Sequence, residues 1–151
     1  MKKILSLIII VALTLSCNEK TQYFFDDILD NFSFNNTLSN STQIIIKQYD
    51  STVTNKTVYV QSYNSIKKYK TNSKQQFESF KAIFIDSEKT SYCCCPKSSY
   101  SIHFLDQQKE LDFFYVDTLE FKTKIRICES GYQYSYIVEK QKWKDFLNEI
   151  N

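Results

Sequence analysis

The cysteines carry the most reactive side chains of this chain, and their spacing is unusual. Cys93, Cys94 and Cys95 are consecutive, and Cys128 follows further along the chain. Pairing all four requires one bridge inside the triplet, where neighbouring Cα atoms are only about 3.8 Å apart, below the usual disulfide range of about 4.4–6.8 Å. The least strained complete set joins Cys93 to Cys95 and Cys94 to Cys128. The alternative is a single bridge from the triplet to Cys128.

These thiols admit a structural and a chemical interpretation. A bridge to Cys128 would act as a staple, typically worth about 2–4 kcal/mol of stability. Clustered thiolates also suit soft metals such as Cu(I) or Zn(II), and a strained bridge can exchange. The sequence has neither a Cys-x-x-Cys pair nor the two-plus-two spacing of zinc sites. The staple is therefore favoured, a thiol- or metal-handling protein is an alternative, and we predict no metal or cofactor.

His103 is the single histidine and hence the only imidazole base. In a strand it lies on the face opposite Tyr100, Ile102 and Phe104, because side chains alternate. A small hydrolase would have to use His103, with Ser101 as a candidate nucleophile, although the Gly-x-Ser-x-Gly elbow is absent. We expect an exposed or hydrogen-bonded histidine on a sheet face and predict no catalytic residues. A hydrolase would instead place His103 in a concave pocket against a carboxylate.

Three tyrosines share one face of a predicted strand: Tyr132, Tyr134 and Tyr136. If exposed, they would form an aromatic platform for a glycan or a protein partner. If buried, they would belong to a core beneath the C-terminal helix. Large residues alternating along one strand face usually form core, so burial is favoured and the binding surface is the alternative.

The N-terminus has the order of a secretory signal peptide. Lys2 and Lys3 are followed by an apolar stretch at 4–15 that only Ser6 and Thr14 interrupt. This stretch is shorter than the roughly 20 apolar residues that a spanning helix needs. Residues 1–16 are therefore predicted to be a signal peptide.

Residues 13–17, LTLSC, resemble the lipobox of bacterial lipoproteins. In that family the peptide is cut before the cysteine, which receives a diacylglyceryl group and usually a further acyl chain such as palmitate. The resemblance implies lipidation of Cys17 and a location in the bacterial cell envelope, on the inner or outer membrane, facing the periplasm or the exterior. Thr14 departs from the leucine that the family favours. Simple secretion and an uncleaved anchor are the alternatives.

Charge and composition exclude several classes of protein. The chain has 19 basic and 17 acidic residues, and removing 1–16 takes away two lysines and no acid, which leaves 17 of each. A neutral body gives no electrostatic case for nucleic acid. With one glycine and one proline, glycine-rich phosphate loops are excluded. Turns are expected to use Asn, Asp and Ser.

Hydrophobic periodicity predicts a tether at 17–41, with a short helix at about 22–33, and one α+β domain at 42–151. The capping box of Ser73 and Gln76 begins a helix at about 74–85. The expected order is (α)ββαββββα, an antiparallel sheet of about six strands with two helices packed on one face. The final helix carries Trp143, Phe146, Leu147 and Ile150, and the strand-like runs are 43–50, 57–64, 100–105, 111–117, 124–128 and 132–139.

Together these observations predict a lipid-anchored envelope protein. Its body is interpreted as a binding or interaction module for an unknown protein or glycan partner, attached to the membrane through the lipid. The alternatives are thiol or soft-metal handling by the cysteines and a small hydrolase that uses His103.

Overall fold

The computed structural model describes residues 36–50, 64–91, 96–131 and 134–151. The chain divides into two compact units, Met1–Ser39 and Asn40–Asn151. In the first unit the described residues are helical, and the Ser39 hydroxyl donates to the Asn36 carbonyl at 3.1 Å. The predicted signal peptide, Cys17 and the helix at 22–33 lie outside the described residues. Within the described ranges, no helix has the length and apolar character needed to span a bilayer.

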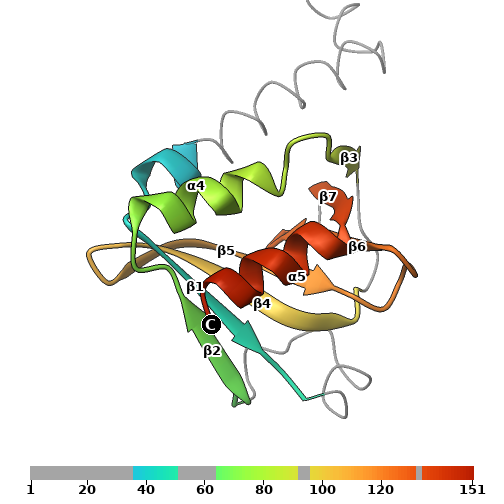
Figure 1. Cartoon of the computed structure of the whole chain (residues 1–151), viewed down its shortest axis with the longest axis horizontal. Helices are drawn as coiled ribbons and strands as arrows, with labels where there is room; N and C mark the ends of the chain where they lie inside the picture. Colours follow the sequence, from blue (N-terminus) through green and yellow to red (C-terminus); the bar gives the residue numbers. More distant parts are fainter. Residues whose placement is uncertain (1–35, 51–63, 92–95, 132–133) are drawn as a thin grey trace, which may run out of the picture. The chain divides into compact units, whose positions relative to one another are not determined.

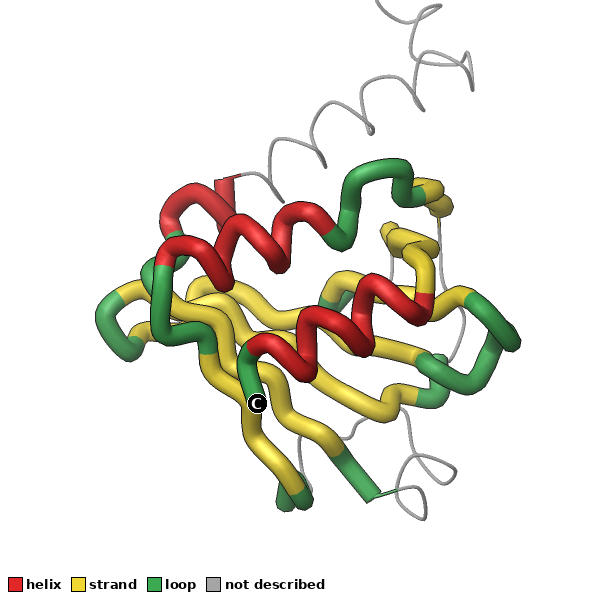
Figure 2. The backbone as a smooth tube through the Cα atoms, in the orientation of Figure 1, coloured by secondary structure: helices red, strands yellow, loops and turns green. Residues whose placement is uncertain are grey.

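The second unit is built on a seven-stranded antiparallel sheet in the order β2-β1-β4-β5-β6-β7-β3. Helices α4 and α5 lie on the same face of this sheet (Figures 1 and 2). The strands are β1 (Gln43–Gln48), β2 (Lys67–Lys70), β3 (Glu88–Ser91), β4 (Ser98–Asp106), β5 (Lys109–Asp117), β6 (Lys124–Glu129) and β7 (Tyr134–Glu139), and the helices are α4 (Lys74–Ala82) and α5 (Lys140–Glu149).

An aromatic core joins the sheet to both helices. Along β4, Tyr100 packs against Trp143 of α5 with ring centroids 5.6 Å apart, and Phe104 packs against Phe80 of α4 at 5.7 Å. Phe80 also contacts Phe146 of α5 at 5.5 Å. Edge-to-face ring pairs of this kind add to the free energy gained by burying their area. The predicted α+β class, with both helices on one face, is confirmed.

Helix α4 begins as its capping residues predict. Ser73 is the N-cap, and its side-chain oxygen accepts from the Gln76 backbone N–H at 3.2 Å. The Gln76 side chain in turn accepts from the Asn72 backbone N–H at 2.7 Å. The helix ends at Ala82, earlier than the predicted 85, because residues 83–86 turn the chain and Asp86 takes a positive φ of 65°.

Within the described residues the sheet has seven strands, one more than the expected count of about six. Strands β2 and β3 were not predicted, and both are edge strands. Strand β2 reads KKYK and buries only Tyr69, while β3 reads EKTS. Neither shows the apolar alternation from which a strand is recognised, because an edge strand packs few side chains. The predicted strand at 57–64 lies outside the described residues.

A two-residue turn joins β4 to β5, and it uses unexpected residues. Asp106 pairs with Lys109, and Gln107 and Gln108 between them have φ values of 45° and 78°. Two positive φ angles are typical of a type I′ hairpin turn, which Asn and Gly favour. The expectation that turns use Asn, Asp or Ser fails here, because the paired strands impose the turn geometry on glutamine.

Candidate functional site

A continuous chain of hydrogen bonds lies on the far face of the sheet, the face opposite α4 and α5 that carries Lys47, Ser101, His103, Phe113 and Tyr115. The Tyr49 hydroxyl is 2.9 Å from Ser101 Oγ, and Ser101 Oγ is 2.8 Å from His103 Nε2. His103 Nδ1 is 2.6 Å from Glu110 Oε2. The four side chains thus form one line, which we call the His103 relay: Tyr49, Ser101, His103 and Glu110.

The strand pairing explains how the relay is assembled. Ser101 and His103 are two residues apart on β4, so their side chains leave the same face. Glu110 lies across the β4–β5 hairpin, where a register shift next to Leu105 brings its carboxylate to the imidazole. Tyr49 directly follows β1, and its backbone N–H donates to the Ser99 carbonyl at 3.0 Å. Two strands and the end of a third therefore supply the relay.

Burial sets the charge state of His103. The residue is 4% exposed, and the loss of hydration lowers the pKa of its imidazole below the ordinary value of 6.5. The hydrogen bond to Glu110 raises this pKa and the charge of Lys47 lowers it, but burial is the largest cause. The imidazole is therefore neutral at pH 7. Because a carboxylate only accepts, Nδ1 carries the proton and Nε2 is free to accept.

The tyrosine fixes the direction of the remaining bonds. Burial is the main cause that raises the pKa of Tyr49 above 10.0, so its phenol keeps its proton. When Ser101 donates its hydroxyl proton to Nε2, the Tyr49 hydroxyl donates to Ser101 Oγ. This assignment satisfies all four groups and leaves the Ser101 oxygen paired with a neutral base. Ser101 is fully buried, so any reagent reaches it only when the far face opens.

Of the two expected forms of His103, the hydrogen-bonded one is confirmed and the exposed one is wrong, because the residue is 4% exposed. The partner is a carboxylate, which is one of the two features that the hydrolase alternative required, and the other, a concave pocket around His103, stays a prediction. Sequence reasoning identified Ser101 and His103 and missed Glu110 and Tyr49. The short turn at 107–108 places Glu110 on the strand beside β4, but the register shift that brings its carboxylate to His103 has no signal in the sequence. Nothing in the sequence marks Tyr49, because its position depends on how β1 pairs with β4.

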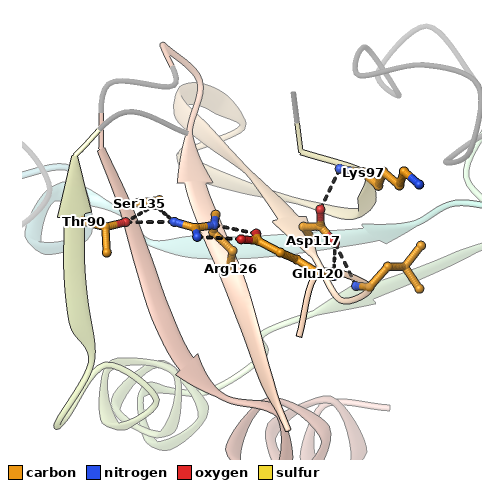
Figure 3. Close-up of polar contacts among 7 residues, drawn as sticks. Thr90, Lys97, Asp117, Glu120, Arg126 and Ser135 are labelled. Atoms are coloured by element: carbon orange, nitrogen blue, oxygen red, sulfur yellow. Dashed lines mark hydrogen bonds and ion pairs between the residues drawn. The ribbon is translucent and has the colours of Figure 1, made fainter. Parts of the chain in front are cut away.

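A second polar cluster lies toward the other end of the far face (Figure 3). Arg126 makes a two-pronged ion pair with Glu120, with Nε and Nη2 at 2.6 and 2.7 Å from the carboxylate oxygens. Its Nη1 donates to Thr90 at 2.9 Å and to Ser135 at 2.8 Å. Because its donors already have protein acceptors, Arg126 ties edge strand β3 to β7 and β6 and offers little to a ligand.

Asp117, drawn in the same view, has an equally structural role (Figure 3). Its carboxylate accepts backbone N–H bonds from Leu119 at 2.8 Å, from Glu120 at 3.1 Å and from Lys97 at 2.7 Å. These bonds close the turn after β5 and hold the start of β4 against it. Asp117 is therefore fully occupied by the backbone around it.

The structure describes two of the three tyrosines that the sequence indicated as a possible binding surface. Tyr136 is buried and packs against Phe84 at 5.5 Å, so it belongs to the core as the favoured expectation had it. Tyr134 is half-buried beneath the Lys89 ammonium at 5.0 Å from its ring. Tyr132 lies outside the described residues.

Cys128 is fully buried and clusters with Tyr49 and Tyr115 on the far face. Residues 93–95 lie outside the described ranges, so the two bridge patterns stay predictions. Among the described residues, no three His, Cys, Asp or Glu side chains gather closely enough to hold a metal ion.

Comparisons with known proteins give little to add. No protein-family model matches the chain, and no curated protein matches it in sequence. Among solved structures, the chain is distantly similar to a thioesterase-like protein from Clostridium sporogenes, at 18% identity and a TM-score of 0.41, over 73% of this chain and 93% of that one. At that TM-score the likeness supports no functional assignment.

Proposed function

We propose that this chain is a lipid-anchored protein of the bacterial cell envelope whose body binds a ligand through the far face of its sheet. The LTLSC segment at 13–17 supports the anchor, since Cys17 directly follows an apolar export segment. Two or more acyl chains give a stable attachment, whereas one binds membranes only marginally. The body behind the anchor is formally neutral, so attachment depends on the lipid and not on basic residues.

The far face supports the binding role. The opposite face is filled by the rings that pack on α4 and α5, whereas the far face carries half-buried apolar side chains, Ile45 and Phe113. Phe113 stacks on the His103 ring with centroids 6.0 Å apart, and the side chain of Glu110 beside it is 48% exposed. The observation that carries this proposal is that partly exposed apolar side chains and the exposed end of the His103 relay, the Glu110 carboxylate, meet at one place on the far face. Binding sites commonly combine apolar area with a few fixed polar groups.

Anchoring is tested by the intact mass of the protein extracted from membranes. We expect a chain that begins at Cys17 and carries the mass of a diacylglyceryl group, with or without an additional acyl chain. Cys17→Ala should remove this mass and release the protein from the membrane fraction, whereas Cys128→Ser should leave the acyl mass unchanged. A soluble protein that retains Met1 would contradict the proposal.

The binding face is tested by photo-crosslinking in intact cells. p-Azidophenylalanine replaces either Phe113 on the far face or Phe77 on α4, which are both half-buried. We expect adducts of defined mass at position 113 and none at 77, because only the far face would meet the ligand. Equal crosslinking at both positions, or none at position 113, would contradict ligand binding by the far face.

A further inference from the structure

We propose that Ser101, His103 and Glu110 form a nucleophile–base–carboxylate site that hydrolyses acyl esters. This inference rests on the proposed function only in using the same sheet face, and it does not depend on the lipid anchor. Serine hydrolases are recognised by the geometry and roles of such a set, not by its order in the chain.

The geometry meets the requirements of the three roles. The nucleophile–base distance of 2.8 Å and the base–carboxylate distance of 2.6 Å both lie within hydrogen-bond reach. Each ring nitrogen of His103 faces a different partner, the Ser101 oxygen on one side and the Glu110 carboxylate on the other.

The charge state also fits a general base. Burial keeps His103 neutral at pH 7, and the Glu110 carboxylate holds the proton on Nδ1. The lone pair on Nε2 then points at Ser101. When Nε2 takes up the serine proton, the resulting imidazolium is stabilised by the ion pair with Glu110.

The reaction balances as an ester hydrolysis. Ser101 Oγ attacks the acyl carbon while its proton moves to His103 Nε2, and the carbonyl oxygen becomes an oxyanion. The intermediate collapses, the alkoxide leaves with the proton from Nε2, and an acyl-serine remains. Water then attacks the acyl carbon and gives its proton to Nε2. Collapse of this second intermediate expels Ser101 Oγ, which recovers the proton, and releases the acid.

Lys47 supplies positive charge at the same place. It is directly opposite Ser101 in the β1–β4 register, so both side chains leave the far face from neighbouring positions. Its charge is close enough to lower the pKa of His103. A cation beside the nucleophile favours the oxyanion over the neutral carbonyl. Half-buried Ile45 and Phe113 nearby indicate an apolar acyl group as the substrate class.

The test is labelling of the full mature chain, in detergent, with an alkyl fluorophosphonate followed by peptide mass mapping. Ser101 Oγ attacks phosphorus, fluoride leaves, and the serine proton passes to His103. We expect one adduct, on Ser101, and none on Ser135, which is equally buried on the far face but bonded to Thr90 and Arg126. Labelling is expected to be slow, since Ser101 must first become exposed.

Variants separate chemistry from folding. Ser101→Ala should abolish the adduct, and His103→Gln should slow labelling by about 100-fold or more, the usual contribution of a general base. Glu110→Gln should slow it by about 10-fold or more, because the tautomer of His103 is no longer fixed. Ser98→Ala, on the same strand and outside the relay, should still give the Ser101 adduct at a rate within a few-fold of the original chain, with a thermal midpoint that does not fall.

The pH profile gives a readout that a structural role would not move. Labelling of the original chain should rise with pH through a pKa below 6.5, and this step should vanish in His103→Gln. If folded protein gives no Ser101 adduct, or labels Ser135 equally, the hydrolase site is overturned while the anchoring and crosslinking results stand independently. Peptide mass mapping of the labelled original chain decides this even if the Ser101→Ala variant fails to fold.

Discussion

Two buried serines of the body differ only in whether their hydroxyls have partners. Ser98 and Ser135 are both fully buried. Ser135 Oγ bonds to Thr90 at 2.6 Å and to Arg126 at 2.8 Å, whereas Ser98 Oγ has no hydrogen-bond partner within the part of the chain that the structure describes. A buried hydroxyl without a partner costs about 1–3 kcal/mol relative to one left in water.

We therefore predict opposite effects for the same substitution. Ser98→Ala should raise the free energy of unfolding by about 1 kcal/mol, because it removes a polar atom that gains nothing from burial. Ser135→Ala should lower it by about 1.5–3 kcal/mol, because it removes a hydrogen bond from a charged group. Urea denaturation of the two variants checks this. A loss of stability in Ser98→Ala would mean that its hydroxyl has a partner.

The residues of the relay were only partly predictable. Ser101 and His103 could be identified because alternation along one strand places them on one face whatever the partner strands do. Glu110 and Tyr49 could not, since their contacts depend on the β4–β5 register shift and on β1 lying beside β4. Contacts within an element follow from its period, whereas contacts between elements follow from register.

At the scale of elements, the β4–β5 turn stores avoidable strain. Gln107 and Gln108 both occupy positive φ, which costs roughly 1–2 kcal/mol for a residue with a Cβ. Replacing them with Asn and Gly should stabilise the body by about 1–2 kcal/mol, because these residues suit a type I′ turn. A thermal melt should show a rise of several degrees. Replacing both with alanine should give no such rise, and an equal gain would point to another cause.

The elements themselves were predicted well where they face the core. Strands β1 and β4 to β7 and helices α4 and α5 were recognised from apolar spacing, because each buries side chains against the aromatic core. The edge strands β2 and β3 were not, since pairing with a neighbour holds them in place and little of their own side-chain area is buried. Backbone pairing leaves no pattern in the sequence.

The stability of the whole body should depend on pH through His103. Burial lowers the pKa of His103 in the folded chain. As pH falls below 6.5, the unfolded chain therefore binds a proton at this imidazole before the folded chain does. Stability is therefore full above about pH 7.5 and falls toward about pH 5. Asp112 acts in the opposite sense, because burial raises the pKa of its carboxyl above 3.8, so that on acidification the folded chain binds a proton there before the unfolded chain does.

Urea denaturation at about pH 7.5 and about pH 5 measures this loss. His103→Asn should flatten the dependence, because no imidazole remains to be protonated in the unfolded chain. Ser73→Ala, which removes the α4 cap and no titrating group, should lower stability by about 1 kcal/mol at both pH values. A steep loss on acidification that persists in His103→Asn would assign the pH dependence to other groups.

The lysines of β2 have a consequence for crowding. An edge strand exposes unpaired backbone groups that another sheet can adopt, and charged side chains are the common protection against such pairing. Lys67, Lys68 and Lys70 are all exposed on β2. Were two molecules to meet along this edge, like charges from both would be pressed together. Where many copies share one surface, this repulsion opposes pairing of the β2 edges of neighbouring molecules into one continuous sheet.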